Sequence, residues 1–190
     1  MGVNVQGLYS HGGPISVCVH DNFGKRLNLL KWLSPISIEE HHNDLKSDLV
    51  VANSGRWFLG SDPYLDWIDP AQSNRILLCP GLPGAGKTVM ASLVIDQLTS
   101  ACASFQRSHS NSVCWLYLGH ADAKGRPGAL LRALLRYLVS KSDNIPRCVE
   151  ELYQKHSEDQ TSPTDDSIMS CLVQVCQSKE NIFLVIDAMD

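Results

Sequence analysis

From residue 75 onward, short apolar runs alternate with stretches in which apolar residues recur at helical spacing. The apolar runs are typical of buried strands and cover residues 76–79, 113–118 and 182–186. Helical spacing is seen over residues 87–98, 127–139, 146–156 and 165–176, and Thr164 or Asp165 is suited to cap the last of these helices. Strands that alternate with helices are typical of a parallel sheet with crossover helices, so the pattern predicts an α/β fold.

The segment before this pattern reads as short helices that follow a weakly ordered lead-in. Ser37 and Glu40 have the spacing of a capping box, and His42 falls on the apolar stripe of the helix that they begin. Asp62 and Pro63 place a cap and a first-turn proline before another short helix. We therefore expect three regions: a lead-in over residues 1–26, a helical segment over residues 27–70 and an α/β domain over residues 71–190.

The composition is that of one ordinary globular domain, with 44% hydrophobic and 19% charged residues and a formal net charge of −4 over 190 residues. A chain of this length buries roughly 70% of its unfolded surface, so it needs no disulfide or metal ion to fold. The mild acidity gives no electrostatic reason to expect a nucleic acid partner. No apolar run approaches membrane-spanning length and no secretory signal is apparent, so we expect no membrane partner.

The seven cysteines are odd in number and irregularly spaced, and none forms a C-x-x-C pair. A zinc ribbon is therefore not expected. Several of them sit in apolar stretches, where a reduced cysteine behaves as a small hydrophobic residue. Reduced cysteines indicate a reducing compartment, and we expect the protein to be cytoplasmic.

A glycine-rich loop carries the clearest chemical signal in the sequence. It matches the phosphate-binding pattern G-x-x-x-x-G-K-[ST], with an apolar run before it and a helical pattern directly after it. Gly81, Gly84 and Gly86 can adopt positive φ values and so let the backbone curl, which allows successive N–H groups and the helix N-terminus to receive the β-phosphate of ATP or GTP. Lys87 can reach phosphate oxygens, and the hydroxyl of Thr88 can ligate Mg²⁺. The predicted nucleotide-binding residues are Gly81, Leu82, Pro83, Gly84, Ala85, Gly86, Lys87, Thr88 and Val89.

An apolar run that ends on an acid is the second signal. Asp187 follows residues 182–186 and would lie at the carboxyl end of a strand, where α/β sheets place their ligands. Taken alone, such an acid is often simply solvated, but together with the glycine loop it indicates a Walker B carboxylate that holds Mg²⁺. Asp190 could orient the metal shell or polarise water. Lys87, Asp187 and Asp190 are thus the predicted catalytic residues, and Thr88 and Asp187 the predicted metal ligands.

Other polar and aromatic candidates have plainer interpretations. Arg132 and Arg136 lie one turn apart, and an arginine finger is conceivable, but a solvated helix face is the favoured interpretation because such a helix needs a polar side. His41 and His42 lack a third metal ligand at useful spacing, so His42 is interpreted as a packed histidine.

Two aromatic residues precede the glycine loop closely. Trp57 and Phe58 could flank a nucleotide base, but a packing role between the amino-terminal helices and the sheet is the simpler interpretation.

The glycine loop, the LVIDAMD run and the Trp57-Phe58-Leu59 segment together resemble the NACHT or nephrocystin-like NTPase domain of fungal NOD-like receptor and ankyrin-repeat proteins. The resemblance covers about residues 27–190. It implies a P-loop NTPase three-layer sandwich with a parallel sheet that is incomplete in this chain. It also implies phosphate binding by residues 81–88, Mg²⁺ coordination involving Asp187, self-association through this domain and downstream repeats in full-length relatives. In the family a Glu follows the acid that corresponds to Asp190, and a later strand inserts between the Walker B and P-loop strands. The sequence stops at Asp190, so we expect nucleotide binding with poor turnover.

Three functions fit this sequence. The first is a nucleotide-dependent signalling switch. The second is a P-loop kinase-type phosphotransferase, which the Asp-Ala-Met-Asp ending favours less. The third is a pseudo-NTPase scaffold that folds around nucleotide without hydrolysing it.

Overall fold

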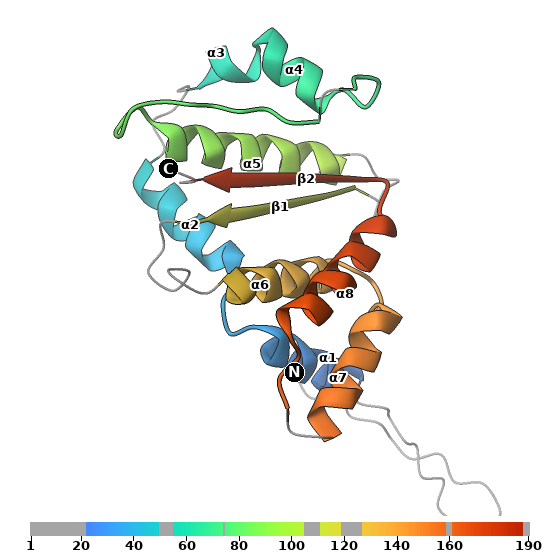
Figure 1. Ribbon diagram of the computed structural model, residues 1–190. Coiled ribbons are helices and arrows are strands. Elements are labelled where there is room, and N and C mark those ends of the chain that lie inside the picture. The colour runs from blue at the N-terminus through green and yellow to red at the C-terminus, as the bar shows by residue number, and fades with distance from the viewer. Residues whose placement is uncertain are drawn as a thin grey trace, which may run out of the picture.

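Figure 1 shows the computed structural model, which describes residues 22–49, 55–73, 75–104, 111–118, 127–158 and 161–187. Within these ranges, the first four helices are α1 (Asn22–Leu33), α2 (Ile38–Leu49), α3 (Arg56–Leu59) and α4 (Asp62–Ile68). The remaining elements are α5 (Lys87–Ser104), β1 (Asn111–Tyr117), α6 (Pro127–Ser140), α7 (Arg147–Glu158), α8 (Asp165–Gln177) and β2 (Asn181–Asp187). None of the helices within these ranges is long and apolar enough to cross a membrane.

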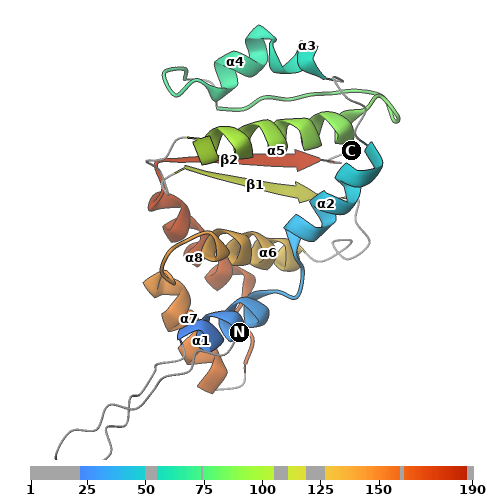
Figure 2. The ribbon, with the colours of Figure 1, turned by 180° about the vertical axis from the view of Figure 1, so that it is seen from behind.

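The two strands form a parallel sheet that lies between helices. β1 and β2 pair in register from Asn111 opposite Asn181 to Tyr117 opposite Asp187. Helix α5 covers one face of the sheet and α6 the other, while α8 packs on α6 and α7 on α8 (Figures 1 and 2). Parallel strands need a crossover connection, and α6, α7 and α8 supply it. The described part of the chain therefore has a mixed α/β fold with a two-stranded parallel sheet. The alternating pattern correctly predicted the α/β class and the parallel pairing.

The apolar run at residues 76–79, predicted as a strand, is not part of the sheet. Residues 75–80 form neither helix nor strand, and the side chains of Ile76 and Leu78 are 70% and 79% exposed. Leu77, between them, packs against the core. Alternation of this kind is typical of an extended segment, but a segment becomes a strand only when a neighbour pairs with its backbone groups. Because β2 does not pair with it, the prediction of a strand at residues 76–79 is wrong.

Helix boundaries follow the local signals closely in several places. α5 begins at Lys87 as predicted and continues beyond the predicted end, to Ser104. The hydroxyl of Thr164 accepts a hydrogen bond from the Ser167 amide at 3.3 Å, which confirms the cap of α8. The cap of α4 is Ser61, one residue before the predicted cap. α1 begins at Asn22, inside the range predicted as lead-in, and residues 1–21 lie outside the described residues.

The core fills the space between the sheet and the helices on its two faces. Its fully buried side chains include Ile95 of α5, Leu135 and Val139 of α6, Val149 of α7 and Ile168 of α8. The indole N–H of Trp115, on β1, donates to the Ile38 carbonyl at 3.0 Å, which ties α2 to the sheet. The amino-terminal helices are therefore part of the same core as the α/β elements.

Arg26 of α1 holds the carboxyl end of α6. Its Nη2 lies 2.9 Å from the Val139 carbonyl oxygen, 3.1 Å from that of Ser140 and 2.6 Å from that of Ser142. The last carbonyls of a helix lack intrahelical partners, and a cation there also opposes the negative end of the helix dipole. One guanidinium thus satisfies the end of α6 and fastens α1 to it.

We predict that Arg26→Met lowers the free energy of unfolding by about 1–2 kcal/mol, because the apolar stem is kept while the charged donor to four carbonyls, that of Asp143 included, is lost. Urea unfolding followed by circular dichroism measures the change. The exposed neighbour Lys25 supplies the control, since Lys25→Met removes one positive charge from the same helix. Equal unfolding midpoints for the two variants would show that the Arg26 contacts contribute nothing.

Candidate functional site

The glycine loop joins the extended segment at residues 75–80 to the first turn of α5. Gly84 and Gly86 adopt φ values of +79° and +87°, in the left-handed region that favours glycine. Gly81, which was expected to share this conformation, is not among the glycines with positive φ. A side chain there would meet Ala85 Cβ at 3.4 Å. The curl of the loop therefore depends on Gly84 and Gly86.

Open space lies next to the two left-handed glycines. A Cβ atom built on Gly84 or Gly86 would meet no heavy atom within 4 Å. The loop side chains Leu82, Pro83 and Ala85 are exposed, and the Ala85 amide donates to the Leu82 carbonyl at 3.1 Å. The backbone thus forms a tight turn with one side open to solvent and to a ligand.

Lys87 is the first residue of α5 and folds back over the loop. Its Nζ donates to the Gly81 carbonyl oxygen at 2.7 Å, which closes the loop across its two ends. The Met90 amide donates to the Gly86 carbonyl at 2.9 Å, and Thr88 and Val89 lie half-buried in the first turn. No acidic residue occurs in this turn. The positive end of the α5 dipole and the Lys87 ammonium group therefore make this end of the helix suited to an anion.

Asp187 is the last residue of β2 and is 8% exposed. Its carbonyl accepts from the Leu118 amide at 3.0 Å, which continues the ladder past the end of β1. In Figures 1 and 2 the carboxyl ends of both strands lie at the same end of the molecule as the start of α5. The elements that carry Thr88 and Asp187 thus converge at one end of the sheet. The third predicted acid, Asp190, lies outside the described residues.

A buried polar cluster lies beside Asp187 and was only partly foreseen. His42 of α2 is 5% exposed; its Nδ1 lies 2.9 Å from the Tyr117 hydroxyl and its Nε2 lies 3.4 Å from Asp96 Oδ1. Burial, followed by the charges of Asp187 and Asp96, raises the pKa of Tyr117 above its ordinary value, so the phenol stays neutral. The packed role predicted for His42 is confirmed. Tyr117 and Asp96 gave no signal in the sequence because neither belongs to a motif.

The two arginines of α6 bind backbone carbonyls of other segments. Arg136 donates to the Ile36 carbonyl at 2.6 Å, and Arg132 donates to the Pro163 carbonyl. Both side chains are half-buried, so the interpretation as a solvated helix face is wrong. Their donors tie α6 to the segments before α2 and α8, and this use gives them a structural role.

The aromatic pair before the loop divides into one packed and one exposed residue. Phe58 packs against the core and lies 5.7 Å, between ring centroids, from the buried Tyr64. Trp57 is 74% exposed and contacts Phe58 edge to face. The packing role predicted for both residues therefore holds for Phe58 and is wrong for Trp57.

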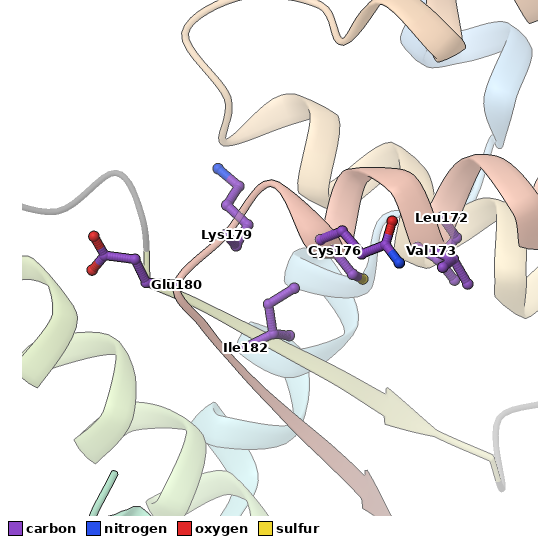
Figure 3. Close-up of a pocket in the computed structure, with 7 residues that line it drawn as sticks. Leu172, Val173, Cys176, Lys179, Glu180 and Ile182 are labelled. Carbon is purple, nitrogen blue, oxygen red and sulfur yellow. The ribbon is translucent and has the colours of Figure 1, made fainter.

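A surface pocket of about 410 Å³ lies at the opposite end of β2 from Asp187. Figure 3 shows that it is lined by residues from the end of α8 and the start of β2, among them Leu172, Val173, Cys176 and Ile182. The glycine loop contributes none of the lining residues. Within the described ranges, no three His, Cys, Asp or Glu side chains come together as a metal site. The predicted phosphate site is thus an exposed loop, separate from this pocket.

Residues 53–190, almost three quarters of the chain, match the sequence pattern of the family described as nephrocystin 3, N-terminal. The chain belongs to the nephrocystin 3 N-terminal family. The match begins just before α3 and includes the glycine loop and Asp187, while α1 and α2 lie outside it. No curated protein and no solved structure shows a significant match to this nephrocystin 3 N-terminal chain.

Proposed function

We propose that the chain binds ATP or GTP with Mg²⁺ through residues 81–89 and serves as the nucleotide-dependent switch module of a NACHT-type signalling protein. The observation that carries this proposal is the loop itself. Gly84 and Gly86 lie in the left-handed region, the loop leads directly into α5, and the Lys87 ammonium group lies over it. A curled backbone, a helix N-terminus and a lysine are the groups that phosphate binding requires.

The open space and the positive charge at the loop support binding of a phosphate group. The Cβ of any other residue at position 84 or 86 would project into the space beside the loop, so glycine keeps this space open. Lys87 already lies within hydrogen-bond distance of a carbonyl oxygen, and a phosphate oxygen would be a stronger acceptor for the same ammonium group. Because the first turn of α5 contains no acidic residue, no side chain of that turn repels an anion.

The Thr88 hydroxyl and the Asp187 carboxylate are the residues that would hold Mg²⁺. Both are oxygen donors of the kind that Mg²⁺ prefers, and both lie on elements that converge at the carboxyl end of the sheet. When bound, the ion neutralises charge on the phosphate oxygens. Asp187 is 8% exposed, and an ionised carboxylate at a buried position is stabilised by a nearby cation.

The proposal includes a P-loop NTPase three-layer sandwich. The parallel pairing of β1 with β2 between α5 and α6 supports this part of the proposal. We also propose self-association through this domain and a cytoplasmic location. The alternatives are a phosphotransferase and a pseudo-NTPase scaffold.

Equilibrium titration of the 190-residue chain with ATP, GTP and ADP, each with and without Mg²⁺, tests the proposal. We expect a triphosphate to bind and Mg²⁺ to tighten the complex. In the presence of Mg²⁺, Asp187→Asn should weaken the affinity for the triphosphate about tenfold, because an amide is a weaker ligand for Mg²⁺ than a carboxylate. The matched control is Asp166→Asn on the exposed first turn of α8. Absence of binding to every nucleotide would contradict the proposal.

Analysis of products in the same samples separates the three functions. Slow release of inorganic phosphate without an acceptor indicates a switch. Phosphate transfer that depends on an added acceptor indicates a phosphotransferase, and bound nucleotide that stays intact indicates a scaffold.

A further inference from the structure

Two cysteines from neighbouring helices face each other at the surface between α7 and α8. Cys148 Sγ and Cys171 Sγ are 3.2 Å apart, and Cys148 Sγ also lies 3.9 Å from the Cys171 carbonyl oxygen. Cys148 is half-buried in the first turn of α7, while Cys171 is 4% exposed in the middle of α8. The sulfurs need to approach by little more than 1 Å to reach the length of a disulfide bond, which is about 2.05 Å.

A groove gives a small oxidant access to both sulfur atoms. Its volume is about 360 Å³, and its lining includes Cys148, Cys171, Lys155, Ser167 and Ser170. Cysteines that serve only as core residues have no such opening, whereas a reactive pair needs one. The groove lies between the two helices, so a peroxide molecule can reach the more accessible sulfur without unfolding the domain.

We propose that Cys148 and Cys171 form a redox-modifiable dithiol that hydrogen peroxide, or another small hydroperoxide, converts to a disulfide linking α7 to α8. The inference is independent of nucleotide binding, since neither cysteine belongs to residues 81–89 or to the strands.

The reaction has two steps. The thiolate of Cys148 attacks one peroxide oxygen, so an S–O bond forms, the O–O bond breaks and hydroxide leaves. The sulfur, oxidised by two electrons, is then a sulfenic acid. The Cys171 sulfur attacks it, the S–S bond forms, and the S–O bond breaks; the proton of Cys171 leaves with the hydroxyl as water. In total, two thiols and one hydroperoxide give one disulfide and, from hydrogen peroxide, two waters.

The order of the steps follows from the surroundings of each sulfur. Burial, together with the neighbouring Cys148, raises the pKa of Cys171 to about 12, so Cys171 stays a thiol at neutral pH. A thiol reacts slowly with peroxide, because the thiolate is the nucleophile. Cys171 is therefore suited to the second step, in which its target is a sulfur already held next to it.

Peroxide treatment of the folded, reduced chain, followed by tryptic digestion and mass spectrometry without reductant, tests the proposal. We expect a cross-link between the peptide of residues 148–155 and that of residues 156–179, with loss of the mass of two hydrogen atoms. The second peptide also contains Cys176, which lines the pocket of Figure 3. Cys176→Ser is therefore the matched control and should leave the cross-link intact, whereas Cys171→Ser should abolish it.

Two further measurements distinguish a disulfide that the fold favours from unspecific oxidation of the cysteines. In denaturant, where the fold no longer holds the sulfurs together, the same treatment should spread cross-links over many cysteine pairs. In the folded chain the link closes a loop of 24 residues, as the separation of 23 positions implies, and should raise the melting temperature by about 5–10 °C. A folded chain that gives only sulfinic or sulfonic acid at Cys148, or links other cysteines instead, would overturn the proposal.

Discussion

The Lys87→Ala variant is expected to lose nucleotide binding, with an affinity at least about 100-fold below that of the original chain. In the original chain, the ammonium group of Lys87 lies over the glycine loop, and its Nζ is 2.7 Å from the Gly81 carbonyl oxygen. Without it, the phosphates keep only the neutral amide donors of the loop and of α5. Titration with a fluorescent triphosphate analogue in the presence of Mg²⁺ measures the loss.

A matched control separates this effect from the general loss of a positive charge. Lys155 is an exposed lysine on α7, so Lys155→Ala changes the net charge equally at a distance from the loop. We expect its affinity to equal that of the original chain. Circular dichroism should show that both variants remain folded. Undiminished binding by Lys87→Ala would mean that residues 81–89 do not form the nucleotide site.

The Leu135→Ala variant is expected to lose about 3–4 kcal/mol of unfolding free energy. Leu135 is fully buried in α6, the helix that covers one face of the sheet and also contacts α1, α2 and α8. Removing its branched end leaves a cavity that these elements cannot close without moving together. Chemical denaturation with urea measures the change from the midpoint and slope.

The same substitution at an exposed leucine provides the comparison. Leu65 of α4 is 45% exposed, so Leu65→Ala removes an equal number of atoms with much less loss of buried area. We expect a change below about 1 kcal/mol there. Equal effects at the two positions would contradict the placement of Leu135 in the buried core.

Much of the fold could be predicted from local patterns. The start of α5 at Lys87 and the cap of α8 by Thr164 depend on a few adjacent residues, and both were found. The runs at residues 113–118 and 182–186 became β1 and β2, because each run pairs with the other. Such signals are carried by the residues that form the element, so no knowledge of the remaining fold is needed.

The run at residues 76–79 failed as a strand for a reason outside itself. Its composition is as apolar as that of β2, but a strand depends on the partner that accepts its hydrogen bonds, and sequence alone does not supply one. The arginines of α6 were misinterpreted for a related reason. The carbonyls of Ile36 and Pro163, which Arg136 and Arg132 bind, come from distant segments that only the folded chain brings near.

The candidate site divides in the same way. The glycine loop is contiguous, so a local pattern was enough to name it as a candidate from Gly81 to Val89, although not to tell which of its glycines have positive φ. The cluster of His42, Tyr117 and Asp96 combines single residues from α2, β1 and α5. Spacing in the sequence could not reveal it, because its members are 54 and 75 positions from His42.

Hydrogen–deuterium exchange of the backbone amides, with and without a saturating triphosphate and Mg²⁺, tests the central claim most directly. The proposed phosphate site consists largely of amides, so exchange at residues 84–89 should slow when nucleotide binds, while exchange in α7 should not change. Unchanged exchange at residues 84–89, or protection confined to the pocket between α8 and β2 shown in Figure 3, would contradict the assignment of the glycine loop as the nucleotide site.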